Sequence, residues 1–597
     1  MVLVATQLGA TPQLYRVAQP LGMREQLTFL EAPAGKAAFL PGDPFTLFFL
    51  QDRVGGGSFY QLLRLDLRTG RSEVLTDGKS QHEAFLLSRD GRWLAYSGTG
   101  RNGRDTDVYL AEVADAHTAR RLTELEGRWL PLDFSPDGNR LLLAQGEVGE
   151  DSRLWLLDVA TGARRLLIPR PDAAAPTGVR SARFGADGKA VYLLLDAGTG
   201  FTSLRRLALA PPAAPLESVV PDVSADVEEL AVARDGTVVF STNEGGYSRA
   251  YLVRGQKAEA LKLPEGVLHG LRFAQGRSDV LFFALEGPTS PTDVWAMTLK
   301  TRKCVRWTKS EVGGLDARSF VAPKLLHYAG ADGVPLSAFL YLPREVPAGT
   351  RVPAVLSFHD GPVAEERPVF RWDYQLLLEE GVAVLAPNLR GSDGFGEAFR
   401  GLDDGALREG VLKDIGASLD VLAGQPEVDA SRVAALGEGY GGYLALAAAA
   451  FFPQRVSAAV DVCGMAHLPS FLESAPPYRR SALRREYGDE RMPGERAVQE
   501  RLSPSNALLG SKAALLVVRG KHDSRVSETE AEGLLQGRGR DGWYLLALDE
   551  GHDFWRKDAR TLTTQVLLLF LQQKLLPAAK AAPKPGPVTP PVEAPSG

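Results

Sequence analysis

The sequence has little of several features that would define its class. Only two of its 597 residues are cysteines, Cys304 and Cys463, which excludes a disulfide framework and fits a reducing compartment. It has no run of eighteen apolar residues, so we expect no membrane-spanning helix. Positive charge is not in excess. The formal net charge of −5 argues against a general affinity for nucleic acid or anionic membranes.

The N-terminus also lacks the marks of a secretion signal. The stretch MVLVATQLGATPQLYRV has neither a basic region nor a long apolar core. We therefore expect a cytoplasmic protein, with a lost N-terminal leader as the alternative. The apolar fraction of 44% and the charged fraction of 24% are ordinary for a globular protein. A chain of 597 residues is too long for one core, which indicates at least two domains.

The first half of the chain repeats. Steps of 44 to 49 residues separate seven strand-like segments, which are centred on Tyr15, Leu63, Tyr109, Trp155, Leu204, Tyr251 and Trp295. Asp-Gly turns recur between them at 88–91, 135–138, 185–188 and 233–236. A four-stranded unit at this period, without a helical pattern, predicts a β-propeller of about seven blades over residues 1–315. A β-sandwich with coincidental spacing is the alternative.

The first blade is expected to be incomplete. Tyr15 should lie on a third strand, yet the sequence before it has room for one strand instead of two. Either this blade is short or the chain begins later than the protein it derives from.

The second half alternates between apolar strands and helical stretches. The expected strands are 337–343, 354–359, 382–388, 432–437, 458–464, 514–520 and 543–549. Such runs separated by helices predict a parallel sheet covered on both faces, which we assign to residues 316–576. The Pro/Ala-rich tail 577–597 is expected to be disordered.

The stretch GEGYGGY, residues 437–443, has the shape of the turn G-x-S-x-G that carries the nucleophile in serine hydrolases. A strand precedes it and a helix rich in small residues follows, as that turn requires. Its middle residue, however, is Gly439, which has no side chain to attack a substrate. The turn is kept while the reactive group is absent. The glycine spacing does not fit a dinucleotide or phosphate-binding loop.

Two further residues follow in the order nucleophile, acid, histidine. Asp523 comes directly after the strand 514–519, and His552 comes after the strand 543–548. A buried carboxylate that holds an imidazole orients a catalytic base, so the order predicts a site with the origin of a catalytic triad. Each motif alone would more often be a capping or surface residue.

The sequence HDGP, residues 359–362, follows the strand 354–359 and would place a backbone N–H of Gly361 beside the cleft. The N–H of Tyr440 would be its partner, and two such donors form an oxyanion hole. A simple turn caused by Gly361 and Pro362 is the alternative reading of this motif.

Together these motifs resemble the prolyl oligopeptidase family of serine peptidases, in particular its acylaminoacyl-peptidase and dipeptidyl-peptidase-like branches. The matching stretches are LLHYAGADGVPLSAFLYLP (325–343), FHDGP (358–362), NLRGSDGFGEAF (388–399), GEGYGGY (437–443), the turn at Asp523 and EGHDF (550–554). The resemblance implies a propeller that caps the active site of an α/β-hydrolase domain and admits peptides or small acylated substrates.

The resemblance also assigns roles. The family's serine would fall on Gly439, its acid on Asp523 and its base on His552, with oxyanion donors at Gly361 and Tyr440. It implies no cofactor and no metal. HDGP in place of the usual HGGP is a second departure, since Asp360 brings a carboxylate near the site of developing negative charge.

No residue is a convincing substitute for the serine. Glu438 is next to the gap, but its strand position should point it away from the cleft. Ser392 is expected to be structural, and Cys463 is expected to be a small buried side chain.

Three hypotheses for function follow from the missing hydroxyl. The first is an inactive family member that keeps a cleft for a peptide or protein ligand. The second is an active serine peptidase in which a natural serine at 439 was changed. The third is a hydrolase that uses bound water with His552 as base. Without the hydroxyl of a serine, no acyl-enzyme can form.

Overall fold

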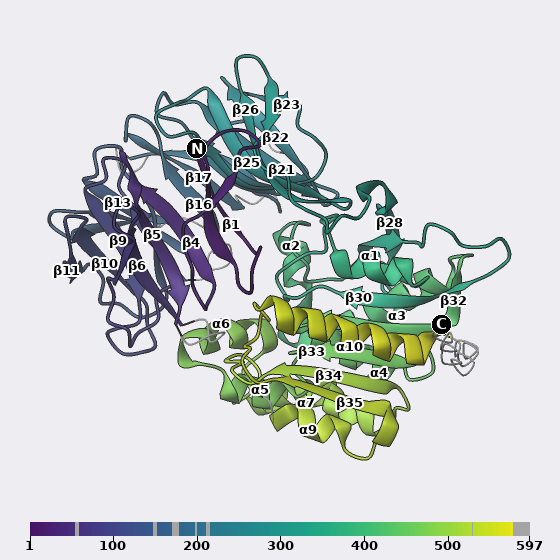
Figure 1. Cartoon of the computed structure of the whole chain (residues 1–597). Helices are drawn as coiled ribbons and strands as arrows, with labels where there is room; N and C mark the ends of the chain where they lie inside the picture. Colours follow the sequence, from purple (N-terminus) through teal and green to yellow (C-terminus); the bar gives the residue numbers. More distant parts are fainter. Residues whose placement is uncertain are drawn as a thin grey trace, which may run out of the picture.

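The computed structural model describes residues 1–53, 59–146, 152–169, 178–196, 200–209, 215–221, 223–527 and 529–576. The tail expected at 577–597 lies outside these ranges. The described chain forms an N-terminal propeller and a C-terminal α/β domain, which lie against each other (Figure 1).

The propeller consists, in the described ranges, of seven antiparallel sheets in chain order. Each of the seven segments that carry the sequence period lies on a different sheet, so the predicted propeller of about seven blades is confirmed. Glycines of the four Asp-Gly turns have positive φ angles of 68° to 90°, the conformation for which glycine was expected.

The blades contain the following strands, sheet by sheet: β1 (Val2–Thr6), β2 (Gln13–Val17), β3 (Arg24–Gln26); β4 (Ala34–Leu40), β5 (Asp43–Asp52), β6 (Tyr60–Asp66), β7 (Arg71–Val74); β8 (Phe85–Leu87), β9 (Trp93–Gly98), β10 (Asp107–Glu112), β11 (Asp115–Arg121); β12 (Trp129–Phe134), β13 (Arg140–Gln145), β14 (Arg153–Asp158), β15 (Arg164–Ile168); β16 (Val179–Phe184), β17 (Ala190–Asp196), β18 (Thr202–Ala208), β19 (Leu216–Ser218); β20 (Val227–Val232), β21 (Val238–Glu244), β22 (Tyr247–Arg254), β23 (Lys257–Leu261); β24 (Val267–Phe273), β25 (Val280–Gly287), β26 (Ser290–Thr298), β27 (Lys303–Arg306).

The core of the propeller lies between neighbouring blades. One cluster joins Ala95 and Val108 of the third blade to Trp129 and Phe134 of the fourth. Each sheet therefore buries both of its faces against the sheets beside it, which explains the nearly continuous apolar character of the middle strands.

The first blade has three strands in the described part of the chain. Tyr15 lies on β2, and β1 is the one strand before it, whereas two strands precede the corresponding residue in each of the other blades. The expected shortness of this blade is confirmed.

The α/β domain is built on one eight-stranded sheet, with the order β28-β29-β31-β30-β32-β33-β34-β35. The strands from β30 onward pair in parallel, and β28 and β29 are antiparallel at one edge. All seven strands expected from the sequence are present. The bounds are β28 (Lys324–Ala329), β29 (Pro335–Tyr341), β30 (Val352–Phe358), β31 (Ala383–Asn388), β32 (Val428–Glu438), β33 (Ala458–Val462), β34 (Ala514–Gly520) and β35 (Gly542–Ala547).

Helices cover both faces of this sheet. The apolar residues of α3 and α4 belong to the core on one face, and those of α1 and α10 belong to the core on the other. No described helix combines the length and apolar character needed to cross a membrane. The bounds are α1 (Trp372–Glu379), α2 (Glu397–Arg400), α3 (Glu409–Ala423), α4 (Tyr440–Phe451), α5 (Leu468–Ser474), α6 (Pro477–Tyr487), α7 (Pro493–Leu502), α8 (Pro504–Ala507), α9 (Thr529–Leu535) and α10 (Lys557–Leu575).

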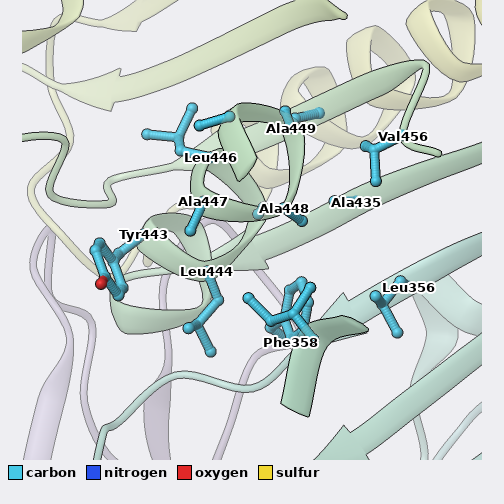
Figure 2. Packing of buried hydrophobic residues seen from close by; sticks show 14 of the residues in the cluster. Leu356, Phe358, Ala435, Tyr443, Leu444, Leu446, Ala447, Ala448, Ala449 and Val456 are labelled. Carbon is cyan, nitrogen blue, oxygen red and sulfur yellow. The ribbon is translucent and has the colours of Figure 1, made fainter. Parts of the chain in front are cut away.

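Helix α4 is the most deeply buried helix of the site. Its sequence is rich in alanine, which favours helix formation and allows close approach to the sheet. Figure 2 shows its short side chains packed with Leu356 and Phe358 of β30 and Ala435 of β32. This packing fixes the helix that begins at the glycine turn.

Charged side chains join the two domains at the carboxyl edge of the sheet. Arg180 of β16 binds Asp393 through two hydrogen bonds of 2.6 and 2.8 Å. Asn243 of β21 donates to Glu365 at 2.6 Å, and Arg367 donates to Glu228 of β20 at 2.7 Å. These loops follow β30 and β31, so the propeller is anchored to the same edge that carries the glycine turn.

A second domain contact involves the loop between β1 and β2. Gln7 donates to the carbonyl of Trp555 at 2.9 Å, and the N–H of Lys557 donates to the carbonyl of Ala10 at 2.9 Å. Arg560 also donates to Gln7. The first blade is thereby attached to the segment that follows His552.

The carboxylates of Glu365 and Glu228 share the guanidinium of Arg367 in the domain interface. Because of this arrangement, the free energy of unfolding depends on pH. Burial raises the pKa of Glu365 to about 8, against the opposing charge of Arg367, and the charge of Glu228 raises it further. Its ordinary pKa is 4.5, so the folded state binds the proton more tightly than the unfolded state does. The resulting stabilisation is complete below pH 4.5 and is lost as the pH rises through 8.

We predict that Glu365→Gln, which resembles the protonated side chain, removes part of this dependence. The melting temperature of the native chain should fall more steeply between pH 5.5 and 8.5 than that of the variant. At pH 8.5 the variant should be more stable by roughly 1–3 kcal/mol. Exposed Glu311→Gln is the control, and parallel melting curves for all three proteins across this range would contradict the prediction.

Candidate active site

The glycine turn connects β32 to α4. Gly439 has φ 55° and ψ −118°, a conformation that side-chain-bearing residues rarely adopt. Its N–H donates to the carbonyl of Val462 at 2.9 Å, and its carbonyl accepts from the N–H of Tyr443 at 3.2 Å. These backbone bonds hold the turn between β33 and the first turn of α4.

The neighbouring glycines are required by close packing. A Cβ on Gly441 would overlap the carbonyl oxygen of Phe358 and lie 2.7 Å from that of His359. A Cβ on Gly442 would lie 2.5 Å from Asp461 Oδ1 and 2.9 Å from the Cα of Gly464. The expectation that the neighbours of position 439 must be small is confirmed.

Asp523 and His552 are brought together from the ends of β34 and β35. The Nδ1 of His552 lies 2.8 Å from Asp523 Oδ2, and both side chains are almost fully buried. Asp523 Oδ1 accepts from the N–H groups of Arg525 and Val526, at 2.7 and 3.0 Å. Burial opposes ionisation of Asp523, but the hydrogen bond and charge of His552 lower its pKa below the ordinary value.

This geometry also assigns the proton on the imidazole. The ionised Asp523 can only accept a hydrogen bond, so Nδ1 of His552 carries a hydrogen, and in the neutral imidazole Nε2 then has the lone pair. His552 lines the same cavity as Gly439, and the lone pair of Nε2 is therefore available to a proton donor in that cavity.

The side chain of Asp360 occupies the space in front of Gly439. A Cβ built on Gly439 would overlap Asp360 Oδ1 and would lie 2.7 Å from its Cγ. The same Oδ1 accepts a hydrogen bond of 2.9 Å from the N–H of Tyr440. A carboxylate thus lies at the place of a serine hydroxyl and on the backbone donor beside it.

His359 fixes the backbone of the Asp360 loop. Its Nδ1 donates to the carbonyl of Asp360 at 2.6 Å, since a carbonyl can only accept. Its Nε2 therefore accepts from the hydroxyl of Ser392 at 3.0 Å, which gives Ser392 a structural role, as expected. Gly361 follows in the cavity wall, and no acceptor for its N–H is found among the described residues.

A buried arginine holds the side chain of Tyr440. Arg408 donates to the Tyr440 hydroxyl at 2.8 Å and forms an ion pair of 2.9 Å with Asp403. Its guanidinium also lies 4.3 Å from the ring centre of Tyr487 and pairs with Glu486. These contacts orient the residue whose N–H binds Asp360.

A cavity of about 250 Å³ opens in front of the glycine turn. Asp360, Gly439 and His552 lie at this opening, together with Tyr440. Much of the remaining wall is apolar or aromatic, and it consists of Pro362, Val363, Met465, Phe471, Ala482, Leu483, Tyr487 and Val526, with Arg479, Glu486 and Arg525 as its charged members. Such a site suits a ligand with an apolar body and a small polar end.

Glu438 is the last residue of β32. It is exposed, and it is not among the residues that line the cavity in front of Gly439. This position is consistent with the expectation that its side chain points away from the cleft.

Cys463 is buried as expected, and it lies near Asp523 and His552. Burial raises the pKa of its thiol well above the ordinary value, and the charge of Asp523 adds to this effect. The reactive thiolate is therefore disfavoured, and Cys463 does not replace the serine as a nucleophile.

Several residues of the site were not found from the sequence. Arg408 and Asp403 belong to no motif, and the apolar wall comes from segments far apart in the chain. The sequence offers little indication that Arg408 belongs to the site. A charged residue at the start of an amphipathic helical stretch ordinarily lies on a solvated face.

Comparisons with known proteins agree with this geometry. Residues 368–577 match the model of the prolyl oligopeptidase family. These residues lie in the α/β domain and include the glycine turn, Asp523 and His552. Over 595 residues the chain is 26% identical to dipeptidyl aminopeptidase BIII of Pseudoxanthomonas mexicana, covering 94% of this chain and 76% of that protein. It is 22% identical over 488 residues to dipeptidyl-peptidase 5 of Porphyromonas gingivalis, covering 79% of this chain and 64% of that protein.

Solved structures of peptidases share the whole architecture. A prolyl endopeptidase superimposes with a TM-score of 0.84 at 19% identity, covering 96% of this chain and 88% of that chain. A puromycin-hydrolyzing peptidase of Mycobacterium tuberculosis gives a TM-score of 0.82 at 18% identity, covering 96% and 94%. These likenesses establish the fold, a propeller joined to an α/β-hydrolase domain.

Restoring a hydroxyl at position 439 tests how much of the family's site is retained. We predict that Gly439→Ser alone gains little, because its Cβ overlaps Asp360 and its turn is strained by on the order of 1–3 kcal/mol. Gly439→Ser combined with Asp360→Gly should react with a fluorophosphonate probe and hydrolyse short peptide esters. Its ester hydrolysis should exceed that of the single variant by about 10²–10³, the effect of one oxyanion donor.

The matched control is Gly439→Ala with Asp360→Gly. It carries the same backbone strain and the same empty space but has no hydroxyl, so it should not react with the probe. If the folded serine-containing double variant is as unreactive as this control, the rest of the site no longer supports acylation.

Proposed function

We propose that the protein is a non-catalytic member of the prolyl oligopeptidase family, and that it binds a peptide or protein segment in its cleft without cleaving it. In this proposal Gly439 marks the position of the absent nucleophile. Asp523 and His552 are the retained acid and base, and Gly361 and Tyr440 are the former oxyanion donors. No cofactor or metal takes part.

The observation that carries this proposal is the position of the Asp360 carboxylate. It fills the space of the missing hydroxyl and binds the N–H of Tyr440. Losing the nucleophile alone costs about 10⁶ in turnover in a serine protease. The remaining rate of about 10³ over water depends on the oxyanion hole and on binding, and Asp360 occupies one donor of that hole.

The position of the Asp360 carboxylate also bears on the hypothesis that a natural serine at position 439 was changed. A serine at 439 would overlap Asp360 where this side chain now lies, so Gly439 and Asp360 fit each other as a pair. A single replacement in an active peptidase would leave a site still shaped for serine. The pairing therefore favours a long-standing loss of the nucleophile.

A hydrolase that uses bound water is the second candidate function. The intact contact between Asp523 and His552 favours it, because this pair could accept a proton from water. The carboxylate of Asp360 opposes it, since a negative charge beside the reacting carbonyl disfavours an oxyanion. We therefore rank it below peptide binding.

The cleft suits an apolar peptide segment. Its wall combines apolar and aromatic side chains with polar and charged ones, its volume is about 250 Å³, and two relatives that align with most of this chain are named as dipeptidyl peptidases. The two cysteines are free, and we propose a cytoplasmic location because such usage fits a reducing compartment.

We predict that the native chain binds short peptides with apolar residues and does not cleave them. Mass spectrometry should find the peptides intact after long incubation, and a fluorophosphonate probe should leave the protein unlabelled. Ala482→Trp should abolish binding because position 482 lines the cavity. Ser481→Trp, an exposed position on the same helix outside that wall, is the matched control.

Peptide cleavage, or stoichiometric labelling of a residue in the cavity, would contradict a non-catalytic function. Equal binding by the Ala482→Trp and Ser481→Trp variants would show that peptides bind elsewhere.

A further inference from the structure

The Asp360 carboxylate is the acceptor for a backbone donor that the helix itself leaves open. Tyr440 is the first residue of α4, and the first N–H of a helix has no partner inside the helix. Asp360 Oδ1 accepts from this N–H at 2.9 Å. Whether the donor is occupied therefore depends on where the backbone of Asp360 is held.

His359 holds that backbone. Its Nδ1 donates to the carbonyl of Asp360 at 2.6 Å, and its Nε2 lies 3.0 Å from Ser392 Oγ. Desolvation lowers the pKa of His359, which favours the neutral ring, so Nε2 accepts a hydrogen bond from the hydroxyl of Ser392. The imidazole thus joins the loop of Asp360 to the loop that follows β31.

A backbone hydrogen bond joins the same two loops. The N–H of Asp393 donates at 2.9 Å to the carbonyl of Ala364, which lies in the same loop as Asp360. Ser392, the neighbour of Asp393, is only 2% exposed and is packed inside the protein. A shift of residues 392–393 therefore acts on the Asp360 loop at two points.

The propeller binds the loop after β31 through charged side chains. Arg180 donates to both carboxylate oxygens of Asp393, at 2.6 and 2.8 Å. Asp226, which is 1% exposed, accepts from the N–H of Gly396 at 2.9 Å. Its other oxygen accepts from the N–H of Thr202 within the propeller at 2.7 Å. The loop is thus bound to a carboxylate that the propeller itself fixes.

Close packing adds to these bonds. A Cβ on Gly396 would overlap the carbonyl oxygen of Gly200, and a Cβ on Gly394 would overlap the carboxylate of Glu365. The carbonyl of Gly200 also accepts from the N–H of Glu397 at 2.8 Å. Helix α2, which begins at Glu397, lies on the side of the α/β domain that faces the propeller (Figure 1). The loop therefore cannot keep its position without the propeller.

We propose that contact with the propeller keeps the Asp360 carboxylate on the N–H of Tyr440. The contact acts through Asp393 and Ser392 and then through His359. When the propeller contact is lost, Asp360 leaves the donor, and an oxygen of a ligand in the cleft can bind there. The position of the propeller thus regulates what the cleft offers to a ligand.

The hydrogen bond of Asp360 is weak enough for this role. Asp360 is exposed, and it forms no ion pair within the described ranges. Water can solvate an exposed carboxylate, so the net stabilisation from its hydrogen bond to Tyr440 is small. Such a bond also weakens steeply when its geometry changes. Loss of the backbone support at His359 is therefore enough to break it.

The inference rests on the proposed function only where it speaks of a ligand in the cleft. The positioning of Asp360 concerns the free protein, and it is tested without a peptide. Ser392 and His359 are positioning residues in this account, since they act on Asp360 and not on a ligand.

The test measures hydrogen–deuterium exchange of the Tyr440 amide in the full chain, with fragmentation that resolves single residues. Asp360→Ala should accelerate this exchange by about tenfold, because it removes a hydrogen bond to a charged group. Ser392→Ala and Arg180→Met should each accelerate it several-fold. Arg180→Lys keeps the positive charge beside Asp393 and should retain most of the protection.

The matched control is Arg128→Met. Arg128 binds Glu83 at 2.9 Å within the propeller, so this variant removes a similar ion pair that does not touch the α/β domain. It should leave the Tyr440 amide unchanged, and the amide of Ala447 inside α4 should be unchanged in every variant. Circular dichroism would show that each variant is folded, and Asp393→Asn removes the same pair if Arg180→Met does not fold.

Unchanged exchange at Tyr440 in Asp360→Ala, or in the variants at Arg180 and Asp393, would overturn the inference. Equal acceleration in Arg128→Met, or acceleration that extends to Ala447, would overturn it in favour of a general loss of stability. If the exchange rates follow the expectation but no peptide binds, the positioning of Asp360 stands and the proposed function fails.

Discussion

The site depends on how closely the glycine turn approaches the end of β30. Gly441 lies against the carbonyl groups of Phe358 and His359, and Gly442 lies against Gly464 at the end of β33. This packing forces the sharp reversal at Gly439 and directs the N–H of Tyr440 into the cavity. Because α4 is itself buried among Leu356, Ala435 and their neighbours, the turn cannot relax without disturbing the core.

In the proposed function, the loss of a nucleophile changes the electrostatics of the site and leaves its shape otherwise unchanged. The contact between Asp523 and His552 remains, as does the support of Tyr440 by Arg408. The carboxylate of Asp360 accepts a hydrogen bond from the backbone N–H of Tyr440. In the proposal, this permanent anion of the protein lies where an active hydrolase would stabilise a transient anion in the transition state.

Much of the architecture could be predicted from the sequence because it depends on local patterns. The Asp-Gly turns and the regular spacing of residues such as Trp155 indicated the blades, and the strand–turn–helix order indicated the α/β domain. HDGP indicated a carboxylate near the site. Its overlap with position 439 could not be predicted, because it depends on the loop conformation that His359 imposes.

The attachment of the first blade to the segment after His552 gives the propeller a direct contact with the part of the α/β domain that follows the histidine. Trp555 and Lys557 are bound by the loop between β1 and β2, only a few residues from the histidine. A displacement of this blade would act on the backbone of the segment that follows His552, and so the position of the propeller and the course of the chain after the histidine are linked.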